Sequence, residues 1–172
     1  CPWTPEEARI MALKMKQFGI HWLEEPINPP EDFDSLAKLA SDTGVPIAAG
    51  ENACTAFEFK KMIRSGAVSF AQPSVAKVGG ITEFRKISVL AEVFGTQIMP
   101  HSPYFGPGFL ATLHLAQSIA SPGWIERIFI EPEAALYPKE IFDPVGGSFK
   151  VPNGIGLGFE PDLDVVKSYR LN

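Results

Sequence analysis

Cysteine is scarce in this chain of 172 residues, which contains only Cys1 and Cys54. Two cysteines build neither a disulfide framework nor a cysteine-rich metal site, so we expect a reduced, cytoplasmic setting. Long apolar runs are also missing, because no segment approaches the roughly 20 residues that cross a bilayer. No charged start followed by an apolar stretch marks a signal peptide. We therefore expect no membrane partner.

Positive charge is limited as well, since 15 Lys and Arg residues stand against 20 Asp and Glu residues and the formal net charge is −5. That sign is wrong for a nucleic-acid surface, and the longest basic run, Lys60-Lys61, is typical of a solvated helix face. Apolar surface is plentiful, because hydrophobic residues make up 45% of the chain and include 13 Phe and 3 Trp. This composition predicts one domain with a sizeable core.

Short apolar runs alternate with helical patterns through the first 126 residues. Capping residues predict the helix starts, with Thr4–Glu7 and Thr55–Glu58 as capping boxes. Helices are expected after Thr4, Asp32, Thr55, Thr82 and about residue 108, and strands over 20–23, 45–49, 67–71, 96–99 and 124–126. The expected strands run into polar residues that lie 23 to 27 positions apart, namely Glu24, Glu51, Ser74, His101 and Glu126. This regular period predicts tandem βα units and a parallel sheet.

Two α/β architectures fit such units. An open doubly wound sheet usually has a glycine-rich phosphate turn after its first strand, whereas residues 24–26 here are Glu-Glu-Pro, which would repel phosphate. A (β/α) TIM-like barrel instead spreads its chemistry over the C-terminal ends of many strands, as this sequence does. We therefore expect residues 1–140 to form the C-terminal part of such a barrel. A complete barrel needs eight units in about 250 residues, so its N-terminal half is expected before Cys1, which is not a start methionine.

The pattern changes after Glu126, where residues 142–160 are rich in Gly, Pro and Phe. An extended strand is possible over 149–152 and a short helix is expected over 162–169. Residues 141–172 are thus predicted to be a tail that packs on the barrel or on a capping domain outside this sequence. The glycine run at 154–158 is not a dinucleotide signature, because it has no βα context.

Two carboxylates are the first candidates for chemistry. Glu24 and Glu51 end neighbouring expected strands, where they would repel each other unless a cation joined them. Oxygen ligands suit Mg²⁺, or alternatively Mn²⁺. The alternative is that these glutamates cap neighbouring helices or pair with Lys or Arg. Glu25 and Asn52 are expected to anchor the two loops.

Three further side chains are candidate catalytic residues. His101 ends a strand and could act as a general base or acid, because imidazole exchanges protons near neutral pH. Lys77 could contact a substrate carboxylate or serve as a structural ion-pair partner. Glu126 could bind substrate, act as an acid, or pair with Arg127. His21 and His114 are expected to be structural.

Five motifs, in order, resemble the mandelate racemase and muconate-lactonizing branch of the enolase superfamily: residues 22–26 (Trp-Leu-Glu-Glu-Pro), 50–52 (Gly-Glu-Asn), 77–80 (Lys-Val-Gly-Gly), His101, and 124–127 (Trp-Ile-Glu-Arg). The resemblance implies a modified barrel with a separate capping domain and one essential Mg²⁺ held by three carboxylates. Glu24 matches the second ligand and Glu51 the third. The first ligand, a Lys-x-Lys base and the capping domain would precede Cys1. The resemblance further implies a hydroxy-carboxylate substrate and a homo-oligomer at full length.

One position departs from the family pattern. His101 matches the histidine base of the mandelate racemase type, but Ser74 stands where an Asp normally orients that histidine, and the muconate-type Lys is also absent there. This departure disfavours a symmetric two-base racemase and favours dehydration of a sugar-derived acid, with His101 acting mainly as an acid. A racemase, epimerase or cycloisomerase of the same superfamily remains an alternative. So does a non-catalytic fragment or binding remnant, and this polypeptide alone is expected to be inactive.

Overall fold

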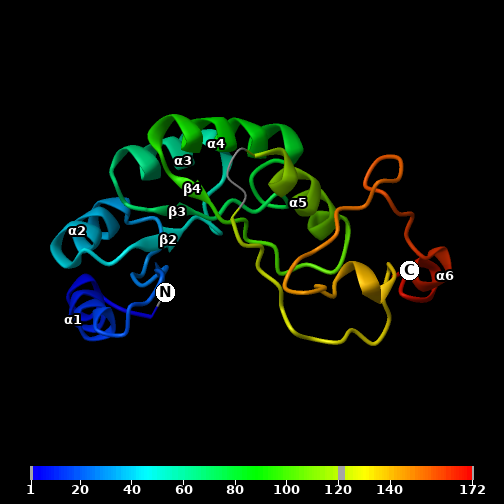
Figure 1. Cartoon of the computed structure of the whole chain (residues 1–172), viewed down its shortest axis with the longest axis horizontal. Coiled ribbons are helices and arrows are strands. Elements are labelled where there is room, and N and C mark those ends of the chain that lie inside the picture. Colours follow the sequence, from blue (N-terminus) through cyan, green and yellow to red (C-terminus); the bar gives the residue numbers. More distant parts are fainter. Residues whose placement is uncertain (1, 120–122, 172) are drawn as a thin grey trace.

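The computed structural model describes residues 2–119 and 123–171, and within them the protein has an α/β fold built on one parallel sheet. Its strands are β1 (Leu23–Glu24), β2 (Ile47–Ala49), β3 (Phe70–Ala71) and β4 (Gln97–Ile98), which neighbour one another in that order. The connecting helices are α2 (Phe33–Thr43), α3 (Thr55–Arg64) and α4 (Ile81–Phe94), with α1 (Pro5–Lys16) before the sheet and α5 (Pro107–Ser118) after it. The helices lie on the convex side of an arch (Figure 1).

The unbroken strand order distinguishes this sheet from a doubly wound one. Adjacent strands pair in register, as in Glu24 with Ala48 and Ala48 with Phe70. Side chains alternate along each strand, so Ile47 and Ala49 pack under the helices, whereas Ala48 and Phe70 face the other side with Met99. Helices therefore cover one face only, which is how consecutive units of a (β/α) barrel are built.

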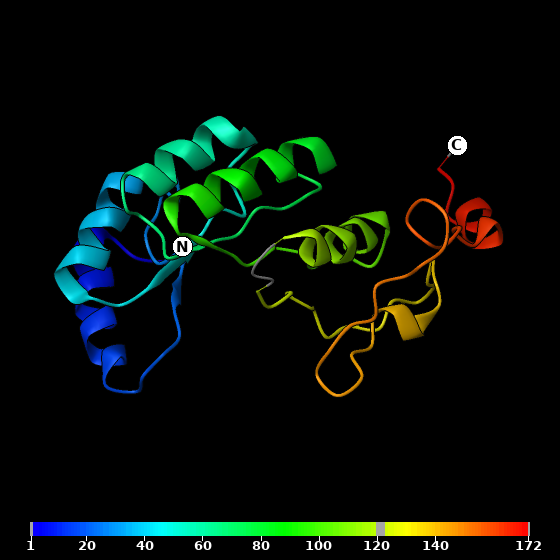
Figure 2. The ribbon, with the colours of Figure 1, turned by 45° about the horizontal axis from the view of Figure 1, so that its top comes forward.

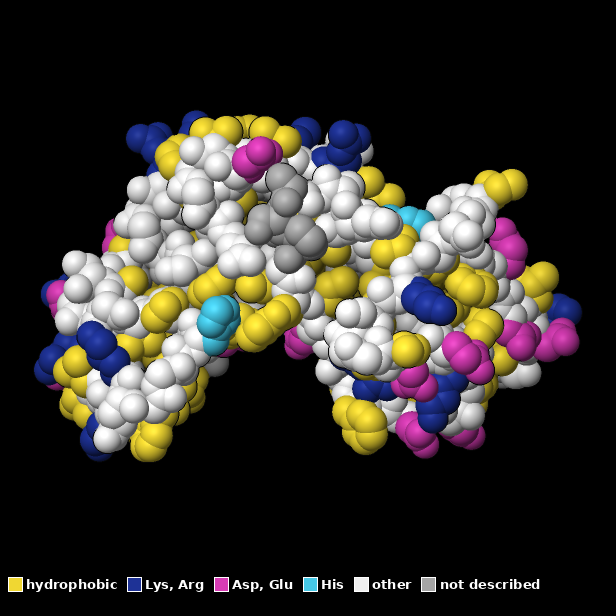
Figure 3. All heavy atoms as spheres, in the orientation of Figure 1, with side chains coloured by type: hydrophobic (Ala, Val, Ile, Leu, Met, Phe, Trp, Pro, Cys, Tyr) yellow, Lys and Arg dark blue, Asp and Glu magenta, His cyan; other side chains and the backbone are white. Residues whose placement is uncertain are grey.

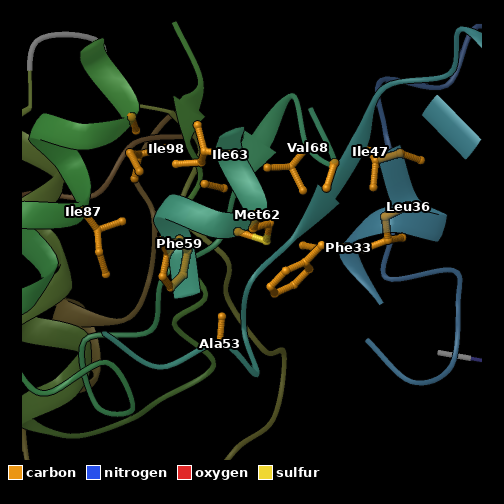
Figure 4. Close-up of a cluster of buried hydrophobic side chains, with 14 of the residues drawn as sticks. Phe33, Leu36, Ile47, Ala53, Phe59, Met62, Ile63, Val68, Ile87 and Ile98 are labelled. Atoms are coloured by element: carbon orange, nitrogen blue, oxygen red, sulfur yellow. The ribbon is translucent and has the colours of Figure 1, made fainter. Parts of the chain in front are cut away.

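The core between the sheet and the helices is continuous. Phe59 and Met62 of α3, Leu36 of α2, Ile87 of α4 and Ile47 of β2 are fully buried members of one cluster (Figure 4). Burying an aliphatic or aromatic side chain of this size contributes about 1.5–3 kcal/mol, so this layer stabilises the packing of the helices on the sheet. On the face shown in Figure 3, further apolar side chains gather along the inner edge of the arch.

Most predicted helix ends are confirmed. Thr4 and Glu7 form the capping box, with the Thr4 backbone N–H donating to Glu7 Oε2 at 2.9 Å. Asp32 accepts from the Ser35 backbone N–H at 3.0 Å, and Gly44 ends α2 in the left-handed conformation. The expected helix after Thr82 begins one residue earlier, at Ile81.

The capping box predicted at Thr55 is wrong. The residue before α3 is Cys54, and Thr55 itself has a φ of 57°. Glu58 accepts from the Cys54 backbone N–H at 2.5 Å, and Glu83 of α4 accepts from the Ala56 backbone N–H at 2.8 Å. A carboxylate from the next helix therefore replaces the local hydroxyl cap.

Two expected strands are also wrong. Residues 124–126 form no strand, and the Trp124 backbone N–H lies 3.0 Å from Met99 Sδ instead of a strand carbonyl. Residues 149–152 form no strand, and the nearest pairing is an isolated bridge between Val145 and Ser148.

A second, smaller core lies beside the sheet (Figure 2). Phe109 and Leu113 of α5 pack there on Tyr137 and Phe142, and a short 3₁₀ helix, η1 (Lys139–Ile141), closes it. The terminal α6 (Leu163–Ser168) begins after Asp162, as expected, but buries no side chain. No helix in the described ranges has both the length and the apolar character to cross a membrane.

Candidate active site

Three predicted site residues meet at the C-terminal edge of the sheet. Glu51 follows β2, His101 follows β4, and Glu126 lies in the extended segment after α5. His101 Nδ1 lies 2.8 Å from Glu126 Oε2 and 3.2 Å from Glu51 Oε2. Parallel strands end on the same edge of a sheet. Residues that lie 25 to 75 positions apart in the chain therefore come together there.

His101 is buried between these carboxylates, with 8% of its surface exposed. Nδ1 is closed off from water, and neither carboxylate oxygen lies along the direction of a proper hydrogen bond to it. Glu126 is fixed independently, since its Oε2 accepts from the Ser102 backbone N–H at 3.3 Å and its backbone carbonyl accepts from Ser102 Oγ at 3.0 Å. The position of the His101 imidazole is therefore set by the packing around it and not by one strong hydrogen bond.

Glu24 shares a hollow with Glu126. Its Oε2 accepts from Trp22 Nε1 at 3.1 Å, and the residue is otherwise exposed. Glu24, Glu126 and Gln72 line a hollow of about 240 Å³ whose remaining walls are Trp22, Met99, Pro100, Trp124 and Ile125. A carboxylate thus stands at two points of a largely apolar cavity.

Glu25 ties the first two strand ends together. It is buried with a φ of 34°, and it accepts from the Gly50 backbone N–H at 3.4 Å and from Asn52 Nδ2 at 2.9 Å. Burial raises the pKa of Glu25, the charge of Glu51 adds to the rise, and the two hydrogen bonds oppose it. These contacts agree with the expectation that Glu25 and Asn52 anchor the two loops.

Ser74 does not orient His101. Its fully buried hydroxyl pairs with the hydroxyl of Tyr104, whose ring meets His101 edge-on with centroids 6.1 Å apart. Carboxylates therefore approach the imidazole from Glu51 and Glu126 instead of from position 74. The Tyr104 contact was not predicted, because the only local signal for it is its place three residues after His101.

Lys77 is not drawn into this cluster. It is exposed, and within the described part of the chain its ammonium makes neither a hydrogen bond nor an ion pair. Arg127, the expected alternative partner of Glu126, instead pairs with Asp143 at 2.7 Å and donates to the Phe142 carbonyl at 2.5 Å.

The other two histidines lie away from the cluster. His21 stacks on Trp124 with centroids 4.9 Å apart, and a ring nitrogen of His114 lies 3.3 Å from the Leu157 carbonyl. Both contacts are structural, as expected.

The oxygen chemistry at the strand ends fits part of a magnesium site. Across residues 2–119 and 123–171, Glu24 and Glu51 neither cap a helix nor pair with Lys or Arg, which were the alternatives. Carboxylate oxygens are the ligands that Mg²⁺ prefers. No three His, Cys, Asp or Glu side chains of the described chain form a group that could hold a metal by themselves.

Comparison with known proteins places this chain in a family. The chain is 35% identical to an arabinonate dehydratase of Saccharolobus solfataricus over 98% of its own length and 45% of the relative's. It is 30% identical to a D-galactarolactone cycloisomerase of Agrobacterium fabrum, covering 98% and 47%. Its structure superposes on a mandelate racemase/muconate lactonizing enzyme from Sulfitobacter sp. with a TM-score of 0.87 at 33% identity, over 97% of this chain and 42% of that one.

The chain thus spans less than half the length of the curated relatives it matches. A family model described as "Enolase C-terminal domain-like" matches residues 1–165. On this evidence the chain belongs to the enolase C-terminal domain family, in its mandelate racemase and muconate-lactonizing branch.

Proposed function

We propose that the full-length protein removes the proton beside the carboxylate of a sugar-derived hydroxy acid and then eliminates the β-hydroxyl. The observation that carries the proposal is the meeting of Glu51, His101 and Glu126 at one edge of the sheet, where Glu126 also lines a cavity together with Glu24. The relatives named a dehydratase and a cycloisomerase support a reaction of this kind.

Glu24 and Glu51 would hold a divalent metal, Mg²⁺ or alternatively Mn²⁺, together with a third carboxylate from outside this chain. When bound, such an ion stabilises the negative charge that develops on the substrate carboxylate as the α-proton leaves. Because that third ligand and a second base are not among these 172 residues, the polypeptide alone is expected to be inactive.

His101 supplies the proton for the elimination. Its Nδ1 faces Glu126 and Glu51, so exchange with the substrate falls to Nε2. The base that takes the α-proton lies outside this chain, the C–O bond at the β-carbon breaks, and Nε2 donates its proton so that the hydroxyl leaves as water. The enol that remains becomes a 2-keto acid.

The arabinonate dehydratase among the relatives favours dehydration as the first candidate. The hydroxyl of Ser74 is engaged with Tyr104, so the carboxylates beside His101 come from Glu51 and Glu126 and not from position 74. The cycloisomerase relative makes lactone opening or closing the second candidate, and the nature of the product separates the two.

The test uses the full-length protein with Mg²⁺ and a panel of sugar acids that includes arabinonate, with 2-keto acid as the product measured. His101→Asn is expected to lower kcat by about 100-fold or more, the usual value of a proton-transfer group. His114→Asn is the matched control and should leave kcat unchanged, because the His114 ring meets the Leu157 carbonyl and lies away from the cluster around His101. Exchange of the α-hydrogen with deuterium from heavy water, without any keto acid, would instead indicate a racemase. If the protein neither binds nor converts any acid of the panel, the alternative that it is non-catalytic would be favoured.

A further inference from the structure

Gln72 is a buried polar residue at the site to which the proposed reaction gives no role. It follows β3 directly, and its backbone N–H donates to the Ala49 carbonyl at 2.9 Å, which extends the ladder and fixes its position. Only 5% of its surface is exposed. Its side-chain carbonyl oxygen is closed off from water and accepts no hydrogen bond from any described residue.

The direction of this side chain follows from strand alternation. Phe70 faces the side of the sheet away from the helices, Ala71 packs under them, and Gln72 returns to the first side. There Gln72 lines the same 240 Å³ hollow as Glu24 and Glu126. Gln72 therefore forms part of the wall of the cavity where the substrate is proposed to bind, and its unsatisfied oxygen lies within that wall.

The acceptor groups and apolar walls of the hollow indicate which kind of ligand it would bind. Gln72 Oε1 and the carboxylate oxygens of Glu24 and Glu126 are all acceptors, so neither carboxylate can satisfy Oε1. A ligand with several hydroxyl groups supplies the missing donors. The apolar walls of Trp22, Met99 and Trp124 suit the C–H faces between those hydroxyls.

We infer that Gln72 is a specificity-determining residue, whose side-chain carbonyl accepts a hydrogen bond from one hydroxyl of the bound sugar acid. This inference rests on the proposed function and adds to it the side-chain carbonyl that recognises one hydroxyl of the substrate. A buried acceptor left without its donor penalises acids that lack that hydroxyl, which is the stronger form of discrimination between similar substrates.

The experiment is a cycle of variants and ligands on the full-length protein with Mg²⁺. Gln72→Met removes the carbonyl with little change of volume. Gln97→Met is the matched control, because Gln97 lies on the neighbouring β4 but lines a different hollow. Binding of arabinonate and of its deoxy analogues, each lacking one hydroxyl, is measured by calorimetry, so that the readout does not depend on turnover.

Gln72→Met is expected to weaken arabinonate binding about tenfold and to leave the affinity for one deoxy analogue unchanged, while Gln97→Met alters neither. An equal loss for arabinonate and for every analogue would overturn the inference and leave the proposed function standing. The same holds if a structure of the full-length protein shows a protein group donating to Gln72 Oε1. Failure of the unmodified protein to bind any hydroxy acid with Mg²⁺ would overturn both.

Discussion

Glu126 Oε2 lies 2.8 Å from His101 Nδ1, and Glu126 reaches this position from a segment that pairs with no strand. Ser102, the residue next to His101, holds Glu126 twice, because its backbone N–H donates to the carboxylate and its hydroxyl donates to the Glu126 backbone carbonyl. The imidazole and the glutamate that flanks it are therefore positioned together, although 25 residues separate them in the chain.

Glu126→Gln tests this arrangement. The amide keeps the shape of the side chain but removes its charge, so His101 loses one of the two carboxylates that flank Nδ1. We expect kcat of the full-length protein to fall about 10- to 100-fold, as when the partner that orients a functional histidine is removed. Glu131→Gln, which breaks only an exposed pair with Lys139, serves as control. Equal activity of the two variants would show that Glu126 does not support His101.

Gly50→Ala tests the turn that presents Glu51. Gly50 has a φ of 130°, and an added Cβ would lie 2.9 Å from a ring carbon of Phe59 and 3.2 Å from the Gln72 backbone nitrogen. We expect a loss of about 2 kcal/mol in unfolding free energy from strain and crowding, with weaker Mg²⁺ binding. Gly66→Ala meets nothing within 4 Å at a φ of 74° and should cost only about 1 kcal/mol. Denaturant unfolding of both variants compares them, and an equal cost would contradict the crowding at Gly50.

The hydroxyl pair of Ser74 and Tyr104 should contribute to stability as a unit. Tyr104→Phe leaves the fully buried Ser74 hydroxyl without its partner, at a cost of about 1 kcal/mol or more. Adding Ser74→Ala to that variant should cost little, because no unpaired hydroxyl remains. A double-mutant cycle measured by denaturant unfolding checks this, and strictly additive effects would mean that the two hydroxyls do not interact.

Asp32 makes a pH-dependent contribution to the unfolding free energy. Hydrogen bonds from the side chain and the backbone N–H of Ser35 lower the pKa of Asp32 below its ordinary value of 3.8. The folded state then binds this proton less readily than the unfolded chain, so the stabilisation is complete above the ordinary value and is lost as the pH falls through the lowered one. Asp32→Ala should cost about 1 kcal/mol at pH 7 and progressively less in acid.

Asp34→Asn is the control for that measurement, because it removes a charge from the same first turn of α2 without removing the cap. Unfolding free energies are compared at several pH values below 5. A cost of Asp32→Ala that stays constant with pH would contradict the account.

Sequence reasoning succeeded where the signals are local. The bounds of α2 follow from Asp32 and Gly44, since a cap acts on residues within one turn. The ends of the first four strands were close to correct for a similar reason: an apolar run must stop where polar residues begin. The parallel sheet then followed from the repeated period.

The errors arose where the partner is distant. Thr55 fits the sequence pattern of a helix cap. The carboxylate of Glu83, 27 residues further along the chain than Ala56, instead accepts from the Ala56 backbone N–H at the start of the helix. The segment over 124–126 has the composition of a strand, yet strand formation needs a neighbouring backbone, and its first N–H meets the sulfur of Met99. Gln72 and Tyr104 were missed because a polar residue reveals its importance only once its burial and its partners are known.

The most direct measurement of the central claim is anomalous diffraction from crystals of the full-length protein soaked in Mn²⁺. We predict a single peak in bonding contact with the carboxylates of both Glu24 and Glu51, which disappears in a Glu24→Gln variant and persists in Glu31→Gln, an exposed loop residue. Density that is absent between these two glutamates, or carboxylates that point away from each other in the soaked crystal, would contradict the account.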